Sequence, residues 1–216
     1  MIANGLMITQ LKNEVKMIIP MECIKWIRLQ RTDCKDPVNN FKDEIQKEYL
    51  EMREYLPKDV DSILDIGCGL GGIDILLSKH YNKPELYLMD NSEISGKLKY
   101  GYDRGKEYYS SFAATELLMK ANYIKNYNLI DIKSKSLPMF EKIDLVISLL
   151  SCGYHYPVTE YLGYVKTILA KSGALIIDIR ENTDGIDIVK KLFPKIKEIS
   201  YNNKSIRICA GIYEKN

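Results

Sequence analysis

Two acidic residues and a run of glycines are spaced as the parts of a nucleotide-binding turn. The apolar run at residues 62–66 carries Asp65 near its end, and four glycines follow within seven residues, at positions 67, 69, 71 and 72. Glycine permits a tight turn that a side chain would block, and a helix that starts behind the turn points its backbone N–H groups into the crevice. Asp90 closes the next apolar run, where a carboxylate can accept hydrogen bonds from a ribose diol.

The position of the first acid favours one cofactor over another. Gly67, Gly69 and Gly72 also satisfy the G-x-G-x-x-G pattern of NAD-binding Rossmann domains. A dinucleotide presents a pyrophosphate, whereas S-adenosylmethionine (SAM) presents an amino acid whose ammonium group requires a carboxylate nearby. Asp65 supplies that carboxylate, so the residues favour SAM. A helix-start turn that binds no ligand is the third interpretation.

The D-x-G-x-G spelling of the turn resembles motif I of class I SAM-dependent methyltransferases. The resemblance covers residues 41–216 and implies SAM as the cofactor. It places Asp131 near the adenine amino group, although that carboxylate could equally cap the turn that follows it. The cofactor-binding residues that the resemblance implies are Asp65, Gly67, Cys68, Gly69, Gly71, Asp90, Asn91, Asp131 and Ser148.

A second functional segment follows the apolar run at residues 143–149. Residues 148–157 read S-x-x-S-x-G-x-H-Y-P and are similar to segments of small-molecule and sugar O-methyltransferases. An oxygen acceptor must lose a proton, and imidazole titrates near neutral pH, so His155 is the expected general base. A loop histidine that is hydrogen-bonded to the backbone is the alternative. Tyr154 and Tyr156 are the expected substrate contacts in this segment, or else they only hold the loop in place.

Two further substrate contacts are expected in the long connection at residues 91–114. Such loops at the carboxyl edge of a parallel sheet tend to carry function. Tyr102 and Arg104 are the candidates there, although the aromatic residues of this segment could instead pack it against the next helix.

The remaining histidine and the cysteines indicate no second site. His80 ends the helix predicted after the glycine turn, where a cation is favoured by the helix dipole. Cys152 follows serine rather than proline, so it does not match the nucleophile of cytosine-C5 methyltransferases. The five cysteines lack C-x-x-C spacing, so we expect reduced thiols and no metal.

The hydrophobic pattern alternates between strand and helix along the chain. This alternation predicts an α/β fold with a doubly wound, seven-stranded, mostly parallel sheet. The last two strands are separated by a short turn and resemble the antiparallel final pair of class I methyltransferases, which NAD-binding domains lack. The predicted strands are 63–66, 86–89, 127–130, 143–149, 174–179, 195–201 and 205–213. The predicted helices are 41–56, 71–79, 115–124, 158–169 with a basic last turn and glycine stop at 171–173, and 185–193.

Length and charge limit the remaining possibilities. A chain of 216 residues can bury one core without disulfides. The net charge of +2 gives no strong nucleic-acid signal and no membrane signal, so a small-molecule substrate is expected. Residues 41–216 form the predicted methyltransferase domain, and residues 1–40 an N-terminal helical extension, with a lid as one arrangement. No export signal is recognisable, so we expect a cytoplasmic protein; its oligomeric state is not indicated.

The sequence therefore predicts a SAM-dependent methyltransferase that acts on an oxygen of a small-molecule or sugar-like acceptor. Three alternatives stay open. The chain could bind SAM without turnover or only with a partner, it could methylate RNA or protein, or it could be an NAD-dependent Rossmann enzyme.

Overall fold

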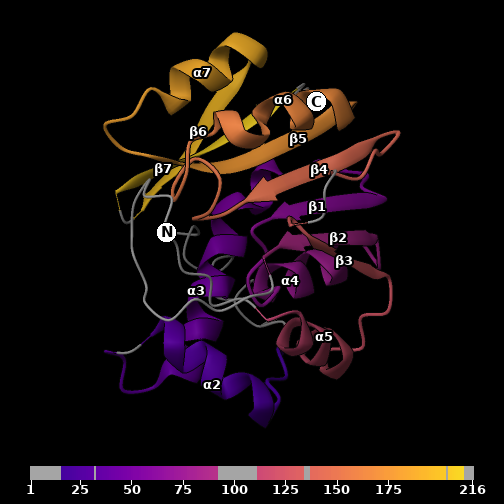
Figure 1. The fold of residues 1–216 in the computed structure, drawn as a ribbon, viewed down its shortest axis with the longest axis vertical. Helices are drawn as coiled ribbons and strands as arrows, with labels where there is room; N and C mark the ends of the chain where they lie inside the picture. The colour runs from indigo at the N-terminus through magenta and orange to yellow at the C-terminus, as the bar shows by residue number, and fades with distance from the viewer. Residues whose placement is uncertain (1–15, 32, 92–110, 134–136, 203, 212–216) are drawn as a thin grey trace, which may run out of the picture.

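A computed structural model describes residues 16–31, 33–91, 111–133, 137–202 and 204–211 (Figure 1). Seven strands form one sheet in the order β3-β2-β1-β4-β5-β7-β6. The first five strands run parallel, and β7 pairs antiparallel with both β5 and β6. The fold class predicted from the sequence is confirmed. The strands are β1 (Ser62–Ile66), β2 (Glu85–Asp90), β3 (Tyr127–Asp131), β4 (Ile143–Ser148), β5 (Leu169–Arg180), β6 (Ile196–Asn202) and β7 (Ser205–Gly211).

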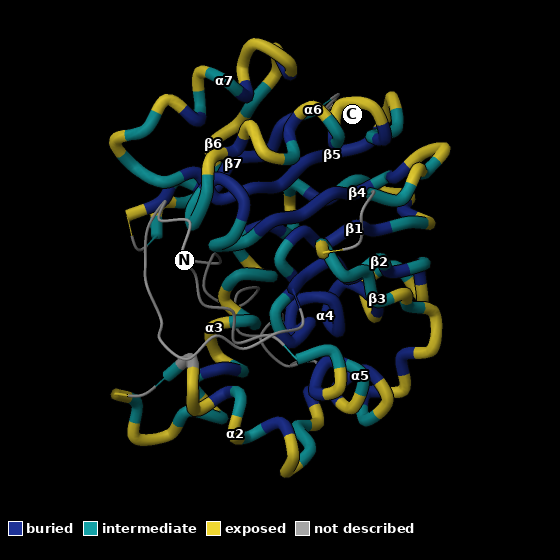
Figure 2. Tube along the Cα trace, in the orientation of Figure 1, coloured by how far each residue is buried: buried dark blue, intermediate teal, exposed yellow. Residues whose placement is uncertain are grey.

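Alternating residues of the central strands face two separate cores. Ile63 and Leu145 belong to the core under α2–α5, whereas their neighbours Leu64 and Val146 belong to the core under α6 and α7. The central strands are consequently buried on both sides, as expected for a doubly wound sheet (Figure 2). The helices are α2 (Met21–Gln30), α3 (Pro37–Met52), α4 (Gly72–His80), α5 (Phe112–Ala121), α6 (Thr159–Ile168) and α7 (Gly185–Leu192), with the 3₁₀ turn η1 (Arg53–Tyr55).

Among the described residues that precede α3, one helix, α2, packs on the domain. α2 buries Cys23 and Ile27 and contacts both α5 and α3. α3 begins at Pro37, because Asp36 caps it by accepting a hydrogen bond from the backbone N–H of Asn39 and proline suits the first helical position. The boundary predicted after residue 40 therefore lies inside α3.

The end of α6 differs from the prediction. The basic residue and glycine at 171–173 were predicted to end this helix, but α6 ends at Ile168 and β5 starts at once with Leu169. A Cβ at Gly173 would lie 2.8 Å from the carbonyl oxygen of Asp144 on β4. The glycine is therefore required for close approach of β5 to β4, beside a register irregularity, and does not cap a helix.

One smaller boundary difference follows from local capping. α5 starts three residues earlier than predicted, because the Ser111 side chain accepts a hydrogen bond from the N–H of Ala114. The last two residues of the predicted final strand, 212 and 213, lie outside the described residues. In the part of the chain that the structure describes, no helix is long and apolar enough to cross a membrane.

Candidate cofactor and methyl-transfer site

The glycine turn joins β1 to α4 in the left-handed conformations that glycine favours. Gly67, Gly69 and Gly71 have φ values of +83°, +57° and +75°. The backbone N–H groups of Gly67 and Cys68 both donate to the carbonyl oxygen of Met89, at 2.7 and 3.2 Å. The turn is thereby attached to the carboxyl end of β2, beside Asp90.

The turn also touches the segment that follows β4. A Cβ at Gly67 would lie 1.8 Å from the hydroxyl oxygen of Ser151, so only glycine fits there. Ser151 in turn lies 3.1 Å from the hydroxyl of Tyr156, oxygen to oxygen. The structure therefore brings the two predicted motifs together, although about eighty residues separate them in the sequence.

Asp90 spans the glycine turn from the end of β2. Its Oδ2 accepts a hydrogen bond from the N–H of Gly69 at 2.7 Å, and its Oδ1 accepts one from the N–H of Asn91 at 2.6 Å. Both Asp90 and Asn91 are buried. Each carboxylate oxygen can accept more than one donor, as a contact to a ribose diol would require.

Other predicted cofactor residues make structural contacts. The hydroxyl of Ser148 donates to the carbonyl of Ile66 at 2.7 Å and accepts from the N–H of Cys152 at 2.9 Å, which joins the ends of β1 and β4. Asp131 pairs with Asp90 in register, and its Oδ1 accepts from the N–H of Lys133 at 2.9 Å. The turn-capping interpretation of Asp131 is thus observed, and its contact to adenine stays a prediction.

Cys68 and Gly71 complete the turn. Burial, followed by the charges of Asp90 and Asp65, holds the pKa of the Cys68 thiol well above its usual range. The side chain is therefore a neutral, packed thiol rather than a nucleophile. Gly71 packs against α5, where an added Cβ would lie 2.7 Å from Cε of Met119.

His155 lies in the turn between β4 and α6. Its backbone N–H donates to the carbonyl of Ser151, and its ring meets the Tyr154 ring edge to face at 5.0 Å. The guanidinium of Arg180 lies 4.8 Å from the centre of the Tyr154 ring. Burial, and then the charge of Arg180, lowers the pKa of His155 below its ordinary value. The imidazole is consequently neutral at pH 7, as a general base must be.

Tyr156 is a half-buried tyrosine of the same turn. Burial holds the pKa of its hydroxyl well above the usual range, and the neighbouring Cys152 adds to the shift. The hydroxyl therefore stays protonated and can donate a hydrogen bond. Tyr102 and Arg104, the other predicted substrate contacts, lie outside the described residues.

His80 is the last residue of α4, as predicted, and it also has side-chain partners there. Its Nδ1 lies 2.8 Å from the hydroxyl oxygen of Tyr49, and its ring packs on Tyr81. Burial, followed by the charge of Arg53, lowers the pKa of His80, which favours the neutral ring. Burial also raises the pKa of Cys152 to about 12, so this cysteine is not a nucleophile.

A buried ionic network behind the site was not predicted. Arg207 on β7 forms two hydrogen bonds to Asp178 on β5, from Nε to Oδ1 at 2.7 Å and from Nη2 to Oδ2 at 2.9 Å. Asp178 Oδ2 also accepts from the N–H of Leu150, at the start of the His155 turn. Glu48 and Glu51 of α3 lie 3.5 and 3.4 Å from the same guanidinium. The sequence does contain a signal for this network, because Asp178 and Arg207 are charged residues within otherwise apolar strands.

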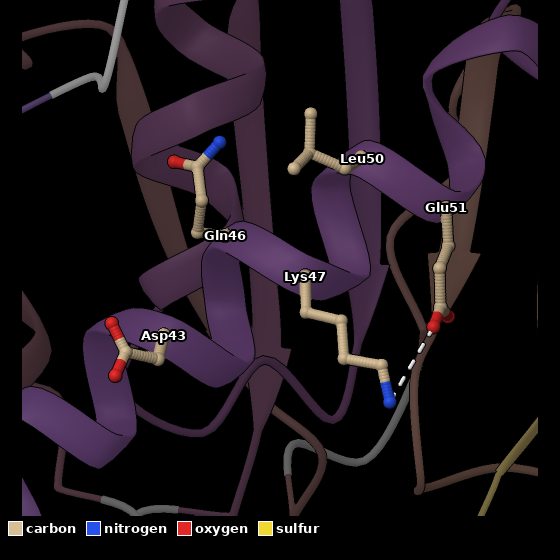
Figure 3. Close-up of a pocket in the computed structure, with 5 residues that line it drawn as sticks. All are labelled: Asp43, Gln46, Lys47, Leu50 and Glu51. Atoms are coloured by element: carbon tan, nitrogen blue, oxygen red, sulfur yellow. Dashed lines mark ion pairs between the residues drawn. The ribbon is translucent and has the colours of Figure 1, made fainter. Parts of the chain in front are cut away.

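A shallow pocket of about 430 Å³ lies on the outer side of α3 (Figure 3). Its residues recur at helical spacing on the face opposite the buried side chains of Phe41 and Met52, and Lys47 pairs with Glu51 across it at 3.7 Å. One helix supplies all of its lining, so the pocket brings together no groups from different elements. It is not the candidate site. The lining residues are Asp43, Gln46, Lys47, Leu50 and Glu51.

No protein-family model and no curated protein matches the chain, but solved structures do. A candidate O-methyltransferase from Nostoc punctiforme PCC 73102 is 16% identical, with a TM-score of 0.58 over 96% of this chain and 67% of that one. TYW2 from M. jannaschii, solved with AdoMet, is 15% identical, with a TM-score of 0.51 over 76% of this chain and 72% of that one.

The chain has the fold of class I SAM-dependent methyltransferases. A third structure, a 16S rRNA methyltransferase from T. thermophilus in complex with AdoMet and guanosine, is 12% identical, with a TM-score of 0.52 over 76% of this chain and 41% of that one. The three neighbours thus share a fold, two of them were solved with AdoMet, and their names differ in what they act on.

Gly69 is the position where a side chain is expected to block the site most directly. No atom of the described residues lies within 4 Å of a Cβ added there, so the side chain would enter open space beside the turn. With φ at +57°, valine would also be strained by about 1 to 2 kcal/mol. We expect Gly69→Val to weaken SAM binding more than about tenfold in calorimetry.

Gly163 provides the matched control for this substitution. It also faces open space, but it is an exposed residue of α6 and has no positive φ. Gly163→Val should bind SAM as the wild type does. Equal binding by both valine variants would remove the glycine turn from the cofactor site.

Proposed function

We propose that the protein binds SAM at the glycine turn and transfers its methyl group to an oxygen of a small-molecule or sugar-like acceptor. The observation that supports this most is the contact between Gly67 and Ser151, which joins the turn to the segment carrying His155. A cofactor held by Asp65 and Asp90 would then lie beside a neutral imidazole.

Methyl transfer requires the acceptor atom, the methyl carbon and the sulfonium sulfur to lie in line. Positioning therefore supplies much of the rate, and a base adds to it when the acceptor is a hydroxyl. In this proposal, His155 accepts the hydroxyl proton as the oxygen attacks the methyl carbon. Tyr154 and Tyr156, from the same turn, contact the acceptor, and Tyr102 and Arg104 remain expected contacts.

Acceptors of other kinds are the main alternative. One structural neighbour carries an rRNA name and another an O-methyltransferase name, so the fold is compatible with both. The nearly balanced charge of the chain, with 31 basic and 29 acidic residues, favours the small molecule. A SAM-binding protein without turnover is the second alternative, and the neutral histidine beside the turn argues against it.

Asp90→Ala tests the cofactor assignment. The substitution should weaken SAM by about 1 to 3 kcal/mol, because charge-assisted hydrogen bonds to the ribose diol are lost. Calorimetry measures the affinity, and circular dichroism verifies the fold. Asp187→Ala, on the exposed side of α7, is the control and should bind normally. A folded Asp90→Ala protein with wild-type affinity would exclude Asp90 from the site.

A further inference from the structure

A second buried acid lies beside Asp65 and was not part of the predicted site. Asp74 belongs to the first turn of α4 and is 0% exposed, and Asp65 is 3% exposed. Neither carboxylate oxygen of Asp74 has a hydrogen-bond partner within bonding geometry among the described residues. A single proton held between the two carboxyl groups would supply the missing bond.

The surroundings of this pair oppose two negative charges. Burial, and then the charge of Asp74, holds the pKa of Asp65 well above its usual range, and burial raises the pKa of Asp74 to about 7. Further negative charge comes from Asp90 at the end of β2 and Glu48 on α3, while the Cys68 thiol of the turn is neutral. Burial and mutual repulsion therefore favour a protonated form of the pair in the ligand-free protein.

The pair lies against the turn that would hold the cofactor. Asp65 occupies the end of β1, and Asp74 Oδ2 lies 3.6 Å from the position of a Cβ at Gly71. A cation that reaches Asp65 would supply the charge that the proton otherwise supplies. SAM carries such a cation in the ammonium group of its amino-acid part.

We propose that Asp74 is a positioning residue for the cofactor, which shares one proton with Asp65 in the empty site and gives it up when the ammonium group of SAM contacts Asp65. This inference rests on the proposed function. The O–H bond of the pair breaks, the proton leaves to solvent, and both carboxylates are then ionised beside the ammonium. Asp74 acts through Asp65 and keeps it oriented toward the turn.

Proton release makes the affinity depend on pH in a defined direction. Below about pH 7 the pair is protonated, so binding must expel the proton and the dissociation constant should fall by up to about tenfold per pH unit as pH rises. Near pH 8 the ammonium group itself begins to lose its proton, so the gain should end there.

The test uses S-adenosylhomocysteine, which carries the same ammonium group without the sulfonium charge. Calorimetry at pH 6.5 in buffers of different ionisation enthalpy should show release of most of one proton by the wild type. In Asp74→Asn the amide can donate to ionised Asp65 and the charge of Asp74 is gone, so the protein should release less proton on binding than the wild type, and its affinity should depend less on pH. Asp187→Asn should behave as the wild type.

A ligand-free measurement separates this inference from the proposed function. The infrared difference spectrum of the ligand-free proteins at pH 7, wild type minus Asp74→Asn, should show the band of a protonated carboxyl group, because the contribution of Glu48 is common to both proteins and cancels. Binding of S-adenosylhomocysteine without proton release, with no such band, would overturn the shared proton and leave the proposed function standing. A band without binding at any pH would overturn the proposed function, and the role of Asp74 with it.

Discussion

Replacement of His155 by alanine should lower turnover by about 10² to 10⁴ while SAM binding stays nearly intact. The imidazole lies in the turn after β4, beside the proposed methyl position, and its pKa is lowered by burial and then by Arg180. A base with a lowered pKa is available above that pKa and is lost as pH falls through it. With SAM at saturating concentration, turnover of the wild type should therefore fall as pH drops below about 6.5, and His155→Ala should lack this acidic limb.

Release of S-adenosylhomocysteine measures this effect once a screen of hydroxylated sugars and phenols has found an acceptor. His80→Gln is the control, because the second histidine packs on Tyr49 away from the turn. If His155→Ala turns over within about threefold of the wild type at every pH, the histidine is structural and positioning alone carries the reaction.

Loss of Arg207 should give the largest change in stability. Its side chain is 1% exposed and that of its partner Asp178 is 0% exposed, so Arg207→Met leaves a buried carboxylate uncompensated. We expect the free energy of unfolding to fall by about 3 to 5 kcal/mol in chemical denaturation at pH 7. Adding Asp178→Asn should recover much of this loss, because the amide oxygen can still accept from Leu150.

The pH dependence of Arg207→Met provides a second check. Glu48 has a pKa raised to about 7, first by burial and against the opposing charge of Arg207. A raised carboxyl pKa means that the folded state binds the proton more tightly than the unfolded state does. The free energy of unfolding therefore falls as pH rises from the pKa of Glu48 in the unfolded chain to about 7. Lowering the pH from 7 to 5 should therefore restore part of the stability. If Arg207→Met lowers the free energy of unfolding at pH 7 by less than about 1 kcal/mol, the network contributes little to stability.

The strand order and the terminal hairpin were predictable because local patterns specify them. Continuous apolar runs marked the parallel strands, and two β-rich runs around a short turn marked β6 and β7. The glycine turn was predictable too, since Gly67 and Gly69 occupy left-handed conformations that other residues avoid. The helix predicted at 158–169 is present as α6, but the stop signal predicted at 171–173 was wrong, because Gly173 belongs to β5 and permits its close approach to β4, which a local pattern cannot reveal.

The side-chain partners that meet across the sheet could not be predicted from the sequence. Asp178 and Arg207 are 29 residues apart, and Glu51 is 156 residues from the same arginine. Their pairing depends on the register of β5 with β7 and on the docking of α3. Asp74 is a similar case, since an acid within an apolar helix was visible, but its neighbour on β1 was not.

Thermal denaturation with SAM, S-adenosylhomocysteine or NAD tests the proposed cofactor most directly. A ligand that binds only the folded protein adds about 2.7 kcal/mol at 100 times its dissociation constant. The site described here predicts that SAM and S-adenosylhomocysteine raise the melting temperature and that NAD does not. A higher melting temperature with NAD alone would contradict the assignment of SAM to this site. So would an unchanged melting temperature with both SAM and S-adenosylhomocysteine up to millimolar concentration.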